Sequence, residues 1–118
     1  MVDIRRGEIW TCEFGVPNGS EAGYDRPVIV VQHDGLNRSN LRTVIVVPLS
    51  SNVQRIDMES QVLISKSVSK LKKDSLAATH LVAVQMRSCL KRRVSTLPSR
   101  VMMDVDEALS RVLGLYDF

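Results

Sequence analysis

The chain has 118 residues, of which 44% are hydrophobic and 25% are charged, so its composition is that of an ordinary globular domain and excludes long-range disorder. Aromatic residues make up only 4%, and a core built from Val, Ile, Leu and Met favours strands with β-branched interiors. The 16 Lys and Arg residues against 13 Asp and Glu residues give a net charge of +3, which permits a nucleic-acid partner but does not require one.

Three strands are predicted in the first half of the chain. Residues 8–14 (EIWTCEF) alternate between apolar and polar side chains and are followed by a Gly- and Pro-containing segment, which indicates a strand entering a loop. Residues 27–32 (PVIVVQ) and 43–49 (TVIVVPL) are nearly continuous apolar runs, which are typical of strands buried on both faces or at the centre of a barrel. Residues 33–42 between them form a polar connector.

The second half of the chain continues the sheet. Residues 60–64 (SQVLI) predict a short strand, and residues 92–97 (RRVSTL) predict the strand that closes the sheet. Residues 75–84 (SLAATHLVAV) are ambiguous because they begin with alanines, but their Thr, His and Val content favours one longer strand. The sequence therefore predicts four to six strands before its last segment.

After Pro98 the hydrophobic period changes to that of a helix. Pro98 or Ser99 would begin this helix, and Gly114 would end it. The apolar stripe consists of Val101, Met102, Val105, Leu109, Val112 and Leu113. This stripe can pack in the core of its own chain or take part in a dimer contact. The expected fold is mainly β with a C-terminal helix, a small curled sheet or barrel that forms a single domain over residues 1–118.

Signals for secretion and for metal binding are missing from the sequence. The N-terminal residues are charged from Asp3 onward, with no apolar run long enough for a signal peptide or a membrane span. Cys12 and Cys89 lie far apart in the sequence without CxxC spacing, which favours two buried free thiols over a disulfide or a zinc site. We therefore expect a cytoplasmic protein that needs no metal, cofactor or membrane.

Two segments carry the residues best suited to chemistry. In NGSEAGYDRPVIVVQ, Pro27 holds Arg26 extended at the mouth of a buried strand, beside a glycine-flanked loop. A plain ion pair of Arg26 with Glu21 or Asp25 is the structural alternative. In PLSSN, a buried strand ends in two hydroxyl residues, which are usually turn or capping groups.

Together these segments can supply an RNA-cleaving site. Cleavage by the RNA's own 2′-hydroxyl needs a group that moves a proton, a cation beside the pentacoordinate phosphate and a donor to a non-bridging oxygen. An arginine, a serine and a nearby carboxylate can fill these three roles. The guanidinium suits charge stabilisation, whereas its very high pKa makes it a poor proton carrier.

The order of motifs along the chain resembles the MazF/PemK toxins of bacterial toxin–antitoxin pairs. The matching segments are RRGEIW, NGSEAGYDRPVIVVQ, TVIVVPLSSN, KKDSLAA and VDEALSRVLGL, from about Arg5 to Leu115. The resemblance implies a homodimeric SH3-like barrel, a fold shared with the CcdB gyrase poisons. It also implies metal-independent, sequence-selective cleavage of single-stranded mRNA to 2′,3′-cyclic phosphate and 5′-hydroxyl ends. A cognate antitoxin would lay its C-terminal segment over the RNA groove.

The resemblance also assigns residues. Arg26 falls on the family's catalytic arginine, Ser50 on its catalytic threonine and Glu21 on its loop glutamate, with Ser51 as the alternative to Ser50. Leu81 stands where many relatives carry a base-contacting glutamine, which predicts an altered base preference. The expected RNA-binding residues are Gly19, Ser20, Asn37, Arg38, Ser51, Asn52, His80 and Leu81.

Three alternatives remain open at the level of sequence. The aromatic residues near the C-terminus, in Leu115-Tyr116-Asp117-Phe118, are compatible with a gyrase poison on the same fold. The departure at Leu81 is compatible with a catalytically silent member that binds only RNA or an antitoxin. The basic cluster that includes Lys70, Lys72 and Lys73 either attracts RNA electrostatically or is an ordinary solvated loop.

Overall fold

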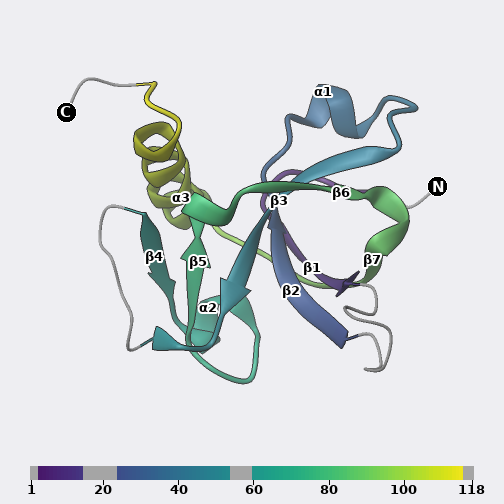
Figure 1. Ribbon diagram of the computed structural model, residues 1–118. Coiled ribbons are helices and arrows are strands. Elements are labelled where there is room, and N and C mark those ends of the chain that lie inside the picture. Colours follow the sequence, from purple (N-terminus) through teal and green to yellow (C-terminus); the bar gives the residue numbers. More distant parts are fainter. Residues whose placement is uncertain (1–2, 15–23, 54–59, 116–118) are drawn as a thin grey trace.

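The structure is a computed structural model that describes residues 3–14, 24–53 and 60–115 (Figure 1). Gly19, Ser20 and Glu21 therefore lie outside the described residues. The elements, in chain order, are β1 (Glu8–Phe14), β2 (Tyr24–Val30), α1 (Asp34–Asn37), β3 (Thr43–Ser50), β4 (Gln61–Ile64), α2 (Lys66–Ser69), β5 (Ser75–Ala78), the 3-10 turn η2 (Thr79–Leu81), β6 (Ala83–Met86), the 3-10 turn η3 (Arg87–Cys89), β7 (Leu90–Thr96) and α3 (Ser99–Val112).

The strands form one strongly curved antiparallel sheet in the order β4-β5-β3-β2-β1-β7, and β6 also pairs with β3. The N-terminal part of β3 pairs with β2 and β6, whereas its last residues leave β2 and pair with β5 through Leu49↔Ala77 and Ser50↔Leu76. In Figure 1 this divergence separates β4, β5 and α3 from β1, β2 and β7. Over the described residues β4 and β7 do not pair, so the expected β fold with a C-terminal helix is confirmed, but "barrel" describes it only loosely.

Apolar side chains cover both faces of the central strands. On one face Trp10, Val28 and Val46 belong to a core that is completed by Ile4, Cys12, Val30, Val44 and Leu90. On the other face Ile9, Ile29 and Val47 pack with α3. This double burial is the reason why β2 and β3 have almost continuous apolar sequences, as predicted.

Helix α3 closes the second core. Its buried residues are Val101, Met102, Val105, Ala108 and Leu109, and burial of each large apolar side chain contributes roughly 1.5–3 kcal/mol. Core packing within the chain therefore accounts for most of the predicted stripe. Val112 and Leu113, also predicted in the stripe, are exposed. The helix begins at Ser99 after the cap residue Pro98, and Gly114 ends it in the left-handed region, with φ of +70°.

The predicted strand over residues 75–84 is wrong as a single element. Thr79 interrupts it, because its backbone N–H and its hydroxyl both donate to the carbonyl of Ser60, at 3.0 and 2.6 Å. The chain then turns through η2 before β6 pairs with β3. The connector over residues 33–42 contains α1, in which the Nδ1 atom of His33 accepts a hydrogen bond from the backbone of Gly35.

Cys12 and Cys89 are both free, as predicted, but only Cys12 is fully buried. Burial raises the pKa of the Cys12 thiol to about 11, and the neighbouring thiol of Cys89 acts in the same direction. No helix in the described part of the chain is both long and apolar enough to cross a membrane.

Candidate active site

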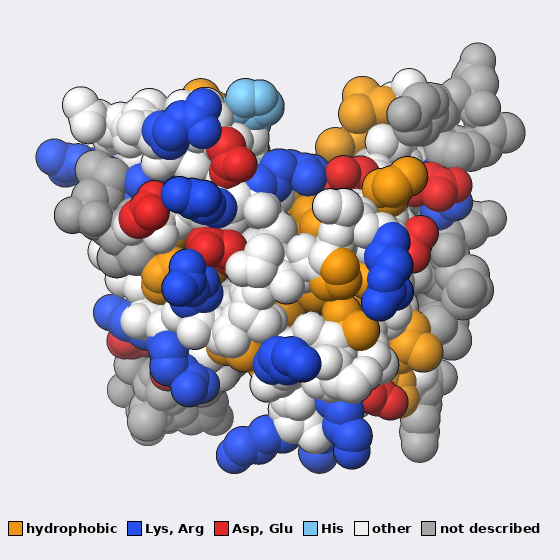
Figure 2. Space-filling model, turned by 180° about the vertical axis from the view of Figure 1, so that it is seen from behind, with side chains coloured by type: hydrophobic (Ala, Val, Ile, Leu, Met, Phe, Trp, Pro, Cys, Tyr) orange, Lys and Arg blue, Asp and Glu red, His pale blue; other side chains and the backbone are white. Residues whose placement is uncertain are grey.

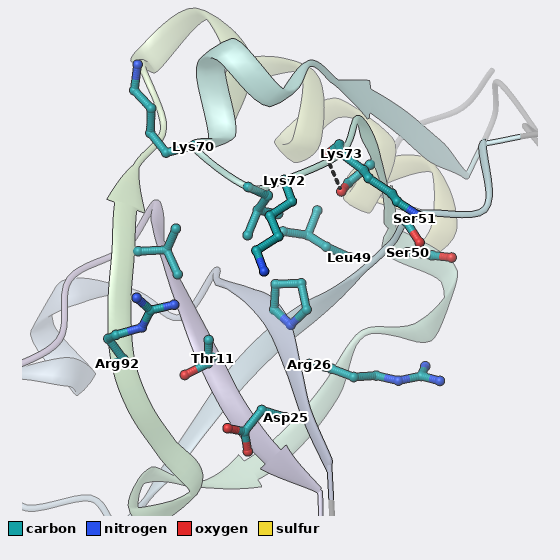
Figure 3. Close-up of a pocket in the computed structure, with 14 residues that line it drawn as sticks. Thr11, Asp25, Arg26, Leu49, Ser50, Ser51, Lys70, Lys72, Lys73 and Arg92 are labelled. Atoms are coloured by element: carbon teal, nitrogen blue, oxygen red, sulfur yellow. Dashed lines mark hydrogen bonds between the residues drawn. The ribbon is translucent and has the colours of Figure 1, made fainter.

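A cavity of about 790 Å³ opens where β1, β2, β3 and β7 meet beneath the connection between α2 and β5 (Figure 3). The charged side chains of its lining are mainly cationic: Arg26, Lys70, Lys72, Lys73 and Arg92. Asp25 is the carboxylate among those lining residues. A concave site with this excess of positive charge suits a polyanion such as a nucleic-acid backbone.

Arg26 and Ser50 line this cavity together. Val28 of β2 pairs with Pro48 of β3; Arg26 lies two residues before Val28, and Ser50 lies two residues after Pro48. Because side chains alternate along a strand, Arg26 and Ser50 project from the same face of their strands. In Figure 3 the side chain of Arg26 extends toward the side of the cavity where Ser50 and Ser51 lie.

Ser50 is held at the end of β3 by interactions on two sides. Its backbone is in register with Leu76 of β5, and its hydroxyl oxygen accepts a hydrogen bond from the backbone N–H of Asn52 at 3.2 Å. Its side chain therefore caps the turn that follows β3, as its position at a strand end suggested. A hydroxyl that accepts one hydrogen bond keeps its own proton, so Ser50 can still donate to a ligand in the cavity.

Thr11 and Arg92 form the other side of the cavity. Thr11 is the cross-strand partner of both Pro27 on β2 and Arg92 on β7, so the three residues lie in one row on one face of the sheet. Lys72 comes from the connection above them. The sequence did not reveal this group, because two register shifts between β1 and β7 decide which face Arg92 occupies, and neither shift has a signature in the sequence.

Several predicted RNA-binding residues lie elsewhere. The structure corrects the prediction that Asn37 binds RNA. Asn37 is only 3% exposed, its amide oxygen accepts from Gln32, and its amide nitrogen donates to the carbonyl of Gln32 and to Asp34. Its role is to hold α1, which excludes the contact with RNA that was expected. Arg38 is exposed at the end of α1, outside the cavity lining.

Of the remaining residues expected to bind RNA, some lie at the cavity and others lie away from it. Ser51 lines the cavity, and Asn52 follows it on the exposed turn. His80 and Leu81 are exposed on η2 and do not line the cavity. On the face shown in Figure 2, Lys and Arg side chains are spread widely and are interspersed with acidic ones. Among the described residues, no three His, Cys, Asp or Glu side chains gather as a metal site would require.

Comparison of the sequence with known families gives one model that spans nearly all of it. The family described as "PemK-like, MazF-like toxin of type II toxin-antitoxin system" matches residues 5–113. "Endoribonuclease MazF6" of Mycobacterium tuberculosis is 35% identical over 112 residues, which cover 95% of this chain and 98% of that protein. "Endoribonuclease MazF" of Staphylococcus epidermidis is 33% identical over 115 residues, covering 98% and 95%.

Solved structures resemble the fold over the same length. A Deinococcus radiodurans structure described as MazE-MazF (Form-II) matches with a TM-score of 0.81 at 17% identity, covering 98% of this chain and 100% of that one. A mycobacterial endoribonuclease in complex with its cognate antitoxin matches with a TM-score of 0.72 at 19% identity, covering 100% of both chains. At such identities the likeness establishes the fold.

Proposed function

The chain belongs to the PemK-like, MazF-like toxins of type II toxin–antitoxin systems, and on that premise we propose that Arg26 and Ser50 cleave single-stranded RNA without a metal ion. Its relatives over almost the whole chain are named endoribonucleases, so the protein is the RNA-cleaving toxin of such a pair. The observation that carries the proposal for the site is that Arg26 and Ser50 line one strongly cationic cavity.

The proposed reaction is a transesterification within the RNA. The 2′-oxygen of one nucleotide attacks the adjacent phosphorus, a new P–O bond forms to that oxygen, and the bond to the 5′-oxygen of the next nucleotide breaks. The 2′-hydroxyl loses one proton and the departing 5′-oxygen gains one, so the reaction takes up and releases no net proton. The products are a 2′,3′-cyclic phosphate and a 5′-hydroxyl, and neither water nor a metal ion is consumed.

Each residue has a distinct role in this step. Arg26 neutralises the charge that develops on the pentacoordinate phosphate, a task that suits its permanently charged guanidinium. The hydroxyl of Ser50, oriented by the N–H of Asn52, donates to a non-bridging oxygen. We assign Glu21, which lies outside the described residues, to orienting Arg26 or the 2′-hydroxyl.

The proposed partners are single-stranded RNA, a cognate antitoxin whose C-terminal segment covers the RNA site, and a second copy of the chain, all in the cytoplasm. Most of the α3 stripe is used in the core, so we look for the dimer contact among other exposed apolar residues. Val84 and Met86 on β6 are 61% and 47% exposed, and Leu81 is exposed beside them. In the described sheet β6 pairs with β3 alone, which leaves its other edge open.

Replacement of Arg26 tests the proposal. Arg26→Ala should lower single-turnover cleavage of a long RNA by at least about 100-fold, as expected when a charge-stabilising donor is lost. Because Arg26 is exposed, thermal unfolding and sedimentation of the variant should match those of the wild type. Arg100→Ala, an exposed site on α3 outside the cavity lining, is the matched control and should cleave normally. Unchanged cleavage by Arg26→Ala would refute the assignment.

A further inference from the structure

We infer that the side of the cavity opposite Arg26 is a second phosphate subsite, in which Arg92, Lys72 and the hydroxyl of Thr11 bind an RNA phosphate next to the one that is cleaved. The inference rests on the proposed function, because its ligand is the RNA strand that passes Arg26 and Ser50. It concerns how the strand is held, and not the reaction itself.

The cavity has two sides because it wraps around the ends of the strands. By strand alternation, Arg26 lies on the same face of the sheet as Val28 and Val30. Thr11 and its cross-strand partners Pro27 and Arg92 lie on the opposite face. Figure 3 shows the result: Lys72 and Arg92 extend toward each other across the cavity near Thr11, and Arg26 extends away from them. Asp25 lies below Thr11, on the side away from Lys72.

Arg92 differs from its neighbours on β7 in having no carboxylate partner within the described structure. Lys91 pairs with Glu13 at 3.4 Å, and Arg93 pairs with Glu8 at 3.1 Å. Neither Arg92 nor Lys72 makes an ion pair with a described residue. Arg92 thus lies between two paired cations and is itself exposed in a concave site. This arrangement favours an external anion as the partner of Arg92.

The connection that carries Lys72 is fixed in place. The carboxylate of Asp74 accepts from the backbone N–H of Lys66 at 2.8 Å, and the hydroxyl of Ser75 donates to the carbonyl of Lys73 at 3.3 Å. The hydroxyl of Ser95 on β7 donates to the carbonyl of Ser69 and so ties the end of α2, where this connection starts, to the strand that carries Arg92. Both cations therefore stand on ordered backbone, which lowers the entropic cost of binding.

The chemistry of the group fits a phosphodiester. An arginine, a lysine and a hydroxyl can each donate to the non-bridging oxygens of one phosphate. An RNA strand whose scissile phosphate lies at Arg26 carries further phosphates along the same cavity. Because such contacts read the backbone and not the bases, this subsite would set the position of the strand and leave base preference to other residues.

The subsite can be tested by neutralising Lys72 and Arg92 and measuring the affinity for RNA. In an Arg26→Ala background, which keeps RNA intact, Lys72→Gln/Arg92→Gln should weaken binding of a single-stranded oligonucleotide about 10-fold. The slope of log K against log salt should become less negative by about 0.7, the value for one phosphate contact on a single strand. Lys91→Gln removes one charge from the neighbouring residue of β7 and should leave the slope unchanged. A double variant that behaves like Lys91→Gln would overturn the inference.

A neutral backbone linkage gives a sharper readout. Methylphosphonate linkages placed one at a time along the oligonucleotide should weaken binding at one position beside the scissile phosphate, and the double variant should lose that penalty. Penalties that stay the same in both proteins would contradict the subsite. Unchanged RNA affinity with weaker binding of a polyglutamate peptide would also overturn it and assign the pair to an acidic protein segment. Wild-type protein that binds RNA through this pair but leaves it uncut would refute only the proposed function.

Discussion

The hydroxyl of Ser50 serves the fold and the proposed reaction through one oxygen atom. It accepts a hydrogen bond from the backbone of Asn52, which fixes the turn after β3. Its own proton remains available to donate to a ligand in the cavity. The relatives' threonine, expected at this position from the resemblance, would keep both functions and add a methyl group that restricts the side-chain rotamer.

Two substitutions at this position should have opposite results. Ser50→Ala removes the donor to the phosphate and should slow single-turnover cleavage by about 100-fold, with a cost to folding of about 1 kcal/mol for the lost turn bond. Ser50→Thr should cleave at least as fast as the wild type. Urea unfolding of each variant separates the two effects, and full activity of Ser50→Ala would show that Ser50 takes no part in the reaction.

Sequence reasoning predicted Arg26 and Ser50 from local features, pre-proline geometry and a strand-end hydroxyl, which the resemblance then aligned. The structure brings both residues to one cavity, and their catalytic roles stay a prediction. It failed at Asn37 because a polar residue in a connector gives no sign that α1 buries its amide. It also missed the place of Arg92, since strand register depends on residues far away in sequence. Local chemistry was therefore predictable, whereas the partners of each side chain required the fold.

At the scale of elements, one cluster joins the N-terminal segment, α1 and α3. The carboxylate of Asp34 accepts hydrogen bonds from the backbone of Arg6 at 2.7 Å and from Asn37 at 3.0 Å. The guanidinium of Arg6 donates to the carbonyl of Val31 and pairs with Asp106 of α3. The hydrogen bond from the backbone of Arg6, followed by that from Asn37, holds the pKa of Asp34 below its ordinary value.

This cluster predicts a pH-dependent stability. Because the folded state lowers the pKa of Asp34, the ionised carboxylate stabilises the fold above its unfolded pKa of about 3.9, and this stabilisation is lost as the pH falls through the lower folded value. Asp34→Asn should therefore cost about 1 kcal/mol at pH 7, and the difference from the wild type should shrink in urea titrations below about pH 4.

Asp104→Asn is the control for that series, since Asp104 is exposed on the same helix that Asp106 anchors and makes no ion pair with a described residue. The free energy of unfolding of Asp104→Asn should equal that of the wild type at every pH. An Asp34→Asn difference that is as large at pH 3 as at pH 7 would rule out the stabilising role of the ionised carboxylate.

Secondary-structure elements were easier to predict from the sequence when their hydrophobic pattern extended over more residues. The 14-residue helix α3 shows a clear period of 3.6 and a terminal glycine, whereas α1 and α2 have four residues each, too few to establish any period. The break in the strand predicted over residues 75–84 depends on the bonds from Thr79 to Ser60, a contact across 19 residues that no local pattern encodes.

For the whole molecule, the apolar runs of β2 and β3 correctly indicated strands buried on both faces, and this burial places their polar ends together. Arg26 comes just before the first of those runs and Ser50 just after the second, so the same sequence pattern that builds the two cores also positions the proposed site. The curled sheet was expected from the sequence, whereas the divergence of β3 toward β5, which opens the cavity between the strand ends, was not predictable.

Metal-independent cleavage at Arg26 is tested most directly by incubating a long RNA with the purified protein in EDTA and mapping the new ends, with Arg26→Ala as the blank for contaminating nucleases. EDTA should leave the rate unchanged, and the fragments should carry 2′,3′-cyclic phosphates and 5′-hydroxyls. Cleavage that stops in EDTA, fragments with 5′-phosphates, or equal cleavage by Arg26→Ala would contradict this mechanism.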